Sequence, residues 1–173
     1  MLEDISGEKI KEQFKSNNKL RLITIVVGGV IVIVLGYFAY IQFMWNPDND
    51  KSKDSYWAGL NYATADSTDM AIDELEAQVK KFDGKVGGEV AQFVLARQYM
   101  AKGEFKDALK ELENVDLSDV YVSVMAKGLR ADCHSELKDY EKAANLYLEA
   151  AEASDNDFTA PMYLMKAGLC AEE

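Results

Sequence analysis

The hydrophobic pattern divides the chain into one unbroken apolar stretch and a longer region with helical spacing. Residues 22–45 carry no formal charge, and as a helix they would span roughly 36 Å at about 1.5 Å per residue. This length exceeds the roughly 30 Å hydrocarbon core of a bilayer, so the pattern predicts a transmembrane helix. The stretch is too long for a secretory signal, and its end, FMWNPDND, lacks a small-x-small cleavage site. We therefore expect the helix to be retained as an anchor.

The charges that flank the apolar stretch predict its orientation. Lys15, Lys19 and Arg21 precede it, whereas Lys51 and Lys53 on the far side stand among aspartates. The positive-inside rule then places residue 1 in the cytoplasm and the residues after the helix across the membrane. Residues 1–21 alternate apolar and charged positions, which predicts a short amphipathic segment at the cytoplasmic membrane surface.

Small residues within the apolar stretch share one helix face. Gly29, Gly36 and Ala39 are seven and three residues apart, so a neighbouring membrane helix could approach them closely. No GxxxG motif is present, which weakens the case for self-dimerisation. Because small residues are common in membrane helices, these three either form a specific contact or simply reflect that composition.

Beyond a polar linker at 46–54, where Pro47 is expected to stop the helix, residues 55–173 repeat with a period close to 35. Aligning GEFKDALKELE with KDYEKAANLYLE pairs Phe105 with Tyr140, Ala108 with Ala143, and Leu112 with Tyr147. This region has helical spacing and no strand-like alternation. It resembles the tetratricopeptide repeat, a helix-turn-helix unit of 34 residues. The expected fold is all-α: a transmembrane helix followed by an α-solenoid.

The repeat pattern places a small residue and an aromatic three apart in the first helix, then an alanine and a bulky residue four apart in the second. Three copies fit this pattern: Gly59, Tyr62, Ala71 and Leu75; Ala96, Tyr99, Ala108 and Leu112; Ala131, His134, Ala143 and Tyr147. A fourth first helix is predicted to begin near Thr159 or Pro161, with Ala167 in the small-residue place. Its partner helix is not in the sequence, so we expect the array to continue after Glu173.

Composition argues against nucleic-acid binding and catalysis. The chain carries 30 acidic and 19 basic residues, a net charge of −11, and residues after Trp45 sum to about −12, which repels phosphate backbones. The one histidine, His134, is expected to be a packed or hydrogen-bonded helix residue, and without a second histidine no catalytic pair is built on it. Cys133 and Cys170 are interpreted as buried free thiols or, alternatively, a disulfide. No cofactor, metal or small-molecule substrate is expected.

A partner-binding surface is the remaining prediction. The first helices of stacked repeats line the concave face of the superhelix. In this register the groove would be formed by Tyr56, Leu60, Phe93, Arg97, Met100 and Asp132, although some of these are alternatively core residues.

Most of the chain resembles the YfgM family, ancillary subunits of the bacterial SecYEG translocon. The resemblance rests on KIKEQFKSNNK, on GYFAYIQF, and on GGEVAQFVLARQYMAKGEFKDALKEL. It implies a non-catalytic inner-membrane subunit with a periplasmic repeat domain, which works beside SecYEG with a PpiD-like chaperone and helps pass emerging chains to folding factors. The alternative is a structural scaffold of another envelope complex, in division or secretion. A receptor that displays its repeats to the cytosol conflicts with the charge bias.

Overall fold

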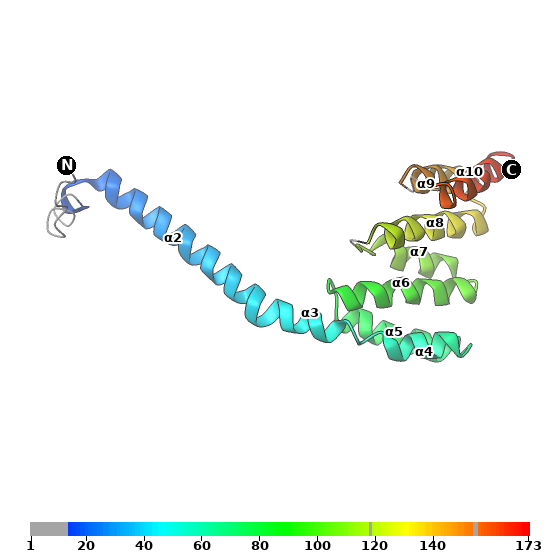
Figure 1. Cartoon of the computed structure of the whole chain (residues 1–173), viewed down its shortest axis with the longest axis horizontal. Coiled ribbons are helices and arrows are strands. Elements are labelled where there is room, and N and C mark those ends of the chain that lie inside the picture. Colours follow the sequence, from blue (N-terminus) through cyan, green and yellow to red (C-terminus); the bar gives the residue numbers. More distant parts are fainter. Residues whose placement is uncertain (1–13, 118, 154–155) are drawn as a thin grey trace. The chain divides into compact units, whose positions relative to one another are not determined.

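The computed structural model describes residues 14–117, 119–153 and 156–173, and within these ranges every regular element is a helix (Figure 1). The predicted all-α fold is therefore confirmed. The chain divides into two compact units, residues 1–47 and residues 48–173. Most of the predicted amphipathic segment, residues 1–21, lies outside the described residues.

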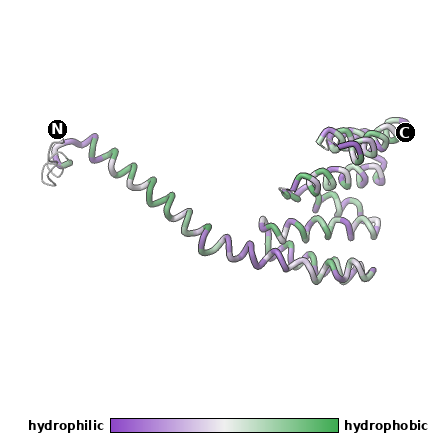
Figure 2. The backbone as a smooth tube through the Cα atoms, viewed as in Figure 1, coloured by the Kyte–Doolittle hydropathy of each residue, from purple (hydrophilic) through white to green (hydrophobic). Residues whose placement is uncertain are grey.

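The first unit contains α2, Asn18–Tyr40, which continues into a π-helical turn, Ile41–Trp45. Asn17 caps the start of α2, because its side-chain oxygen accepts from the amides of Lys19 at 3.1 Å and Leu20 at 3.2 Å. None of the α2 residues is buried. In Figure 2 the backbone of this helix is coloured as hydrophobic over most of its length. By length and composition it is the one helix among the described residues that could cross a membrane, with a mean hydropathy of 2.7 over its best window.

The predicted linker is in fact partly helical. Helix α3 covers Asn46–Ser52 and includes Pro47, which the sequence suggested would stop the helix. The π turn explains the difference, because the Asn46 amide bonds to the Ile41 carbonyl five residues earlier and the hydrogen-bond ladder is already displaced there. Proline has no backbone N–H to donate. At Pro47 this missing donor falls where the helical hydrogen-bond pattern is already interrupted, so the helix continues.

The second unit is a stack of helical hairpins (Figure 1). Neighbouring helices in sequence pack against each other from α4 through α10. Their bounds are α4 Trp57–Thr64, α5 Thr68–Lys81, α6 Val86–Ala101, α7 Phe105–Glu113, α8 Val120–Glu136, α9 Tyr140–Ala153 and α10 Thr159–Ala171. The last helix begins at Thr159, where the sequence predicted a fourth first helix.

The three hairpin turns repeat the same backbone geometry. Two residues beyond the end of each first helix stands a residue of positive φ: Asp66 at 55°, Gly103 at 77° and Lys138 at 64°. The next amide then bonds to the carbonyl five residues earlier, as Ser67 to Tyr62, Glu104 to Tyr99 and Asp139 to His134, at 3.0, 2.9 and 2.8 Å. This is the 6→1 hydrogen bond of a Schellman cap. The aromatic position of the repeat therefore also marks where each first helix closes.

Small residues at the predicted places allow close helix packing. Ala71, Ala96, Ala108, Ala131 and Ala143 are fully buried. In the earliest copy, Gly59 lies so close to Leu75 that a Cβ at this position would overlap the leucine side chain. The buried residues form three successive clusters, across α4–α6, α6–α8 and α8–α10, so each hairpin shares its core with the next.

Candidate functional site

The start of α6 is held by side chains from α3. The Val86 amide donates to Asn49 Oδ1 at 2.9 Å, and the Gly87 amide donates to the buried Ser52 Oγ at 3.0 Å. These oxygens satisfy amides that have no partner inside α6. Gly87 is required by the close approach, because a Cβ there would overlap the Ser52 carbonyl. Asn49 and Ser52 therefore have a structural role: they dock α3 onto the repeats.

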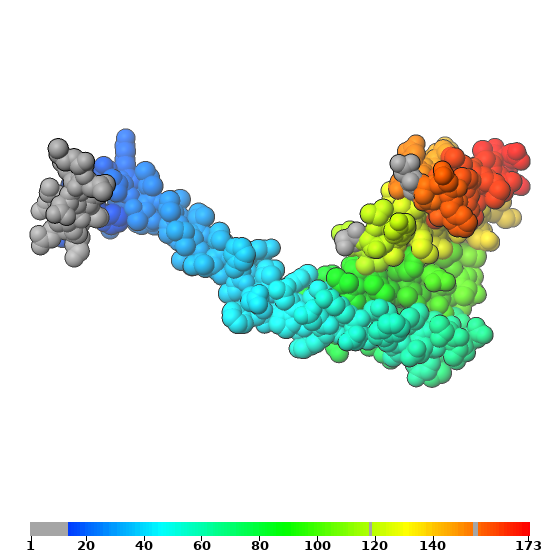
Figure 3. Space-filling view, in the orientation of Figure 1, coloured from blue at the N-terminus to red at the C-terminus, as the bar shows by residue number. Residues whose placement is uncertain are grey.

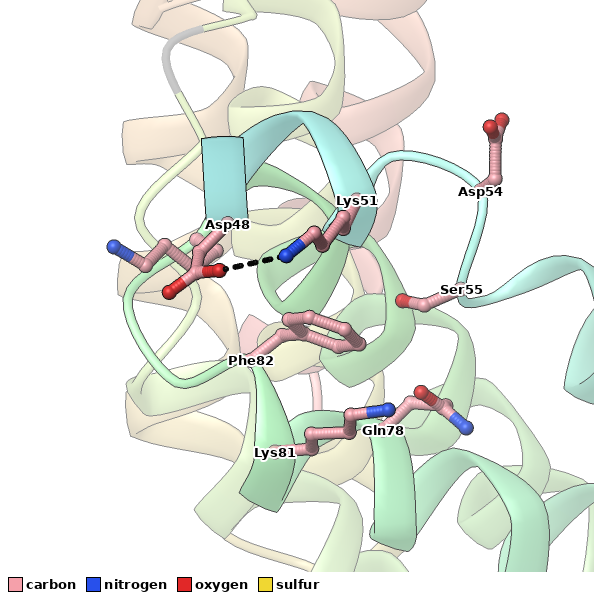
Figure 4. A pocket seen from close by; sticks show the side chains of 8 residues that line it. Asp48, Lys51, Asp54, Ser55, Gln78, Lys81 and Phe82 are labelled. Atoms are coloured by element: carbon pink, nitrogen blue, oxygen red, sulfur yellow. Dashed lines mark hydrogen bonds and ion pairs between the residues drawn. The ribbon is translucent and has the colours of Figure 1, made fainter. Parts of the chain in front are cut away.

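A cleft of about 700 Å³ lies between α3 and the end of α5 (Figure 4). Lys51 Nζ pairs with Asp48 Oδ1 at 3.5 Å, and Lys81 Nζ lies 5.0 Å from the centre of the Phe82 ring. Asp54 and Lys85 also line the cleft. The lining therefore carries three lysines and two aspartates, so charges of both signs meet in this cleft.

The predicted groove residues do not form one open surface. Phe93 is only 8% exposed and belongs to the α6–α8 core, which agrees with the core alternative stated for these positions. Tyr56 and Leu60 pack against the α4–α6 cluster, and Met100 packs against the α6–α8 cluster. Of these first-helix positions only Arg97 is exposed. The register predicted the helix correctly, but Phe93 lies in the apolar cluster that α6 shares with α7 and α8.

Asp132 joins three helices rather than facing an open groove. Its Oδ1 accepts from Tyr147 Oη of α9 at 2.5 Å and from Lys166 Nζ of α10 at 2.6 Å. Lys166 also lies 5.3 Å from the centre of the Tyr147 ring, and that ring stacks on Tyr163 with centroids 6.4 Å apart. Burial and then the bond to Asp132 raise the pKa of the Tyr147 hydroxyl. Asp132 therefore stabilises the packing of α8, α9 and α10.

An apolar groove of about 320 Å³ lies where α8, α9 and α10 meet, and the sequence interpretation did not predict it. Figure 3 shows α8 (yellow) and α10 (orange to red) beside each other on the surface. Val120 and Tyr121 at the groove are 66% and 77% exposed. The lining residues that the structure describes carry no formal charge: Val120, Tyr121, Val124, Met125, Ala153, Asn156, Thr159 and Tyr163. The run VYVSVM at 120–125 was the available signal, since one helix face cannot bury every apolar residue in it.

The histidine and the two cysteines, which are the side chains with reactive potential, have structural roles. His134 Nδ1 lies 3.2 Å from Asp139 Oδ2, in agreement with its interpretation as a hydrogen-bonded helix residue. Cys133 and Cys170 are both buried and free. Burial raises the pKa of the Cys133 thiol to about 12, which suppresses its thiolate form. Within residues 14–117, 119–153 and 156–173, no group of three His, Cys, Asp or Glu side chains could hold a metal ion.

Comparison with known proteins agrees with the repeat geometry. The family model described as tetratricopeptide repeat-like domain matches residues 11–121, which is more than half of the chain. The matched range includes α2 and the first two hairpins and ends at the start of α8. No curated protein and no solved structure matches the chain. With its hairpins, Schellman turns and buried alanines in the repeat positions, the chain belongs to the tetratricopeptide repeat-like domain family.

Proposed function

We propose that this chain is a membrane-anchored, non-catalytic adaptor that holds a tetratricopeptide repeat domain at the membrane surface. The observation that carries the proposal is α2, whose large apolar side chains are exposed along its length, as Ile33 is at 72%. Soluble proteins rarely expose an apolar surface of this extent, and a membrane would cover it. Repeat domains of this family are typically modules for protein interaction, which supports an adaptor rather than an enzyme.

The orientation follows from charge. Lys15 precedes α2, and Lys19 and Arg21 lie in its first turn, so the N-terminus is cytoplasmic and the repeat domain lies on the outer side of the bacterial inner membrane. Protease added to spheroplasts should digest the repeat domain while the membrane is intact. A domain that is digested only after the membrane is broken would reverse the orientation.

The partner in this proposal is the SecYEG translocon, together with a PpiD-like periplasmic chaperone, and the adaptor helps pass emerging chains to folding factors. The resemblance to the YfgM family over KIKEQFKSNNK, GYFAYIQF and the α6–α7 sequence supports this choice. Purification of the tagged chain in mild detergent should recover SecY. Recovery of division or secretion components without SecY would instead favour a scaffold of another envelope complex.

The membrane helix offers the surface for that assembly. A Cβ at Gly29 or at Gly36 would have no atom within 4 Å, so the face shared with Ala39 is open to a neighbouring helix. Once the helices associate, contacts of the repeat domain become effectively intramolecular, so weak contacts there suffice. The anchor should therefore contribute most to co-purification.

Two sets of variants test whether α2 contributes more to the recovery of SecY than the repeat domain does. Gly29→Leu with Gly36→Leu should reduce SecY recovery more than Arg97→Ala with Met100→Ala. Gly28→Leu is the matched control, because Gly28 also has an open Cβ position but lies on a neighbouring face. The opposite order of effects would place recognition in the repeat domain and leave α2 as a tether.

A further inference from the structure

The groove at the junction of α8, α9 and α10 combines an apolar lining with acidic flanks. Asp119, Glu152 and Asp157 directly adjoin lining residues in sequence, and all three are exposed. Asp119 also caps α8, since its Oδ1 accepts from the Val122 amide at 2.9 Å. Apolar contacts at the centre with charges at the rim are the usual arrangement of a protein interface.

The charge of the whole repeat unit strengthens this local pattern. Residues 48–173 contain 26 Asp and Glu against 14 Lys and Arg, a net charge of −12. A second copy of this unit would bring the same negative charge to the groove and be repelled. A basic segment would be attracted at long range and would meet carboxylates of residues next in sequence to the groove lining.

We propose that this groove binds a basic amphipathic segment of another protein, which inserts apolar side chains beside Val120, Tyr121 and Met125. The Lys and Arg side chains of the segment then face Asp119, Glu152 and Asp157. Methionine and tyrosine suit the role, because Met125 can adapt to different apolar shapes and the exposed Tyr121 ring offers a large contact area. The proposal rests on the adaptor function above and specifies the chemistry of the partner.

The test uses the full chain in nanodiscs of zwitterionic lipid, with empty nanodiscs as a blank. Two fluorescent helical peptides share the same leucine face, and one carries lysines where the other carries glutamates. Fluorescence anisotropy should show binding of the lysine peptide at least about tenfold tighter than that of the glutamate peptide. The difference should shrink as salt rises from 0.05 to about 0.5 M, since exposed charges are screened.

Substitutions in the groove should remove this binding. Tyr121→Glu should weaken the lysine peptide about tenfold or more, whereas Met70→Glu, at an exposed apolar position of α5, should not. The triple change Asp119→Asn, Glu152→Gln and Asp157→Asn should weaken it about tenfold, and the asparagine can still cap α8. Asp73→Asn, Glu113→Gln and Glu141→Gln remove the same charge elsewhere and serve as the control.

Three results would overturn the proposal. The first is equal affinity for both peptides, and the second is unchanged binding by the Tyr121→Glu variant. The third is a concentration-dependent dimer in analytical ultracentrifugation that Tyr121→Glu abolishes, which would make a second copy the occupant. Failure of the unaltered chain to recover SecY would overturn the translocon assignment but would leave the peptide results valid, so the two failures are distinguishable.

Discussion

Gly128 of α8 lies directly against the ring of Tyr163 of α10. A Cβ on Gly128 would be 2.5 Å from Cε1 and 2.6 Å from Oη of that tyrosine, which is only 5% exposed. Tyr163 also stacks on Tyr147 and lines the apolar groove. The absence of one side chain in α8 therefore sets how closely α10 approaches and shapes one wall of the groove.

Replacement of Gly128 by alanine should lower the free energy of unfolding relative to the same change at Gly168. Both changes gain alanine's helix propensity of about 1 kcal/mol, but only the first forces the Tyr163 ring to move. Overpacking of this kind costs about 1–3 kcal/mol. Thermal unfolding in detergent, followed by circular dichroism, should show the Gly128→Ala protein melting below Gly168→Ala. Equal melting temperatures would contradict the contact.

The repeat register makes a second prediction. Ala108→Trp and Ala143→Trp should each destabilise the repeats by about 1–3 kcal/mol or more, because both alanines are fully buried between helices. Ala77→Trp, at an exposed position of α5, should leave the unfolding transition nearly unchanged. Urea titration of the three variants measures the difference. Wild-type stability of the Ala108 and Ala143 variants would rule out the register.

Removal of the caps that α3 supplies should loosen the start of α6. Ser52→Ala and Asn49→Ala should each cost about 1 kcal/mol, because each leaves an α6 amide without its acceptor. Hydrogen exchange should become faster at the Val86 and Gly87 amides, while the Tyr99 amide in the same helix keeps its protection. Asn61→Ala, at an exposed position of α4, is the control. Unchanged exchange at both amides would show that α3 does not hold α6.

Cys133 should resist alkylation in the folded protein. Burial, reinforced by Asp132 and Glu136, raises the pKa of its thiol from 9.0 to about 12, so at pH 8 the thiolate fraction falls on the order of 10³-fold. Iodoacetamide should label the Cys133 peptide only after urea unfolding, as read by mass spectrometry. Rapid labelling of the folded chain at pH 8 would contradict the buried position.

The raised pKa of the Cys133 thiol also makes the stability of the folded protein depend on pH. The folded thiol keeps its proton to a higher pH than the unfolded thiol, so the contribution of Cys133 is fully present below about pH 9. It is lost as pH rises from about 9 towards about 12. Cys133→Ala should reduce this alkaline loss of stability, as measured by urea titration at pH 8 and pH 10.

The features that sequence predicted correctly are those determined by local spacing. The uninterrupted apolar run predicts a long apolar helix whatever surrounds it, because the length of a helix follows directly from how many residues it contains. The buried alanine positions could also be predicted from the sequence, since Ala108 and Ala143 recur with the same neighbours. Each hairpin must bring its two helices close together at that point. The aromatic places at Tyr62, Tyr99 and His134 turned out to carry the carbonyls that close each first helix.

By itself the sequence determined the helices, their register and the charge of the repeat unit. Only the tertiary structure decided which faces of those helices remain open. Phe93 is buried in the apolar cluster that α6 shares with α7 and α8, whereas Tyr121 is exposed because α9 and α10 meet α8 without covering that position. Periodicity identifies an apolar stripe, but burial of a given residue depends on the neighbours that reach it from elsewhere in the chain.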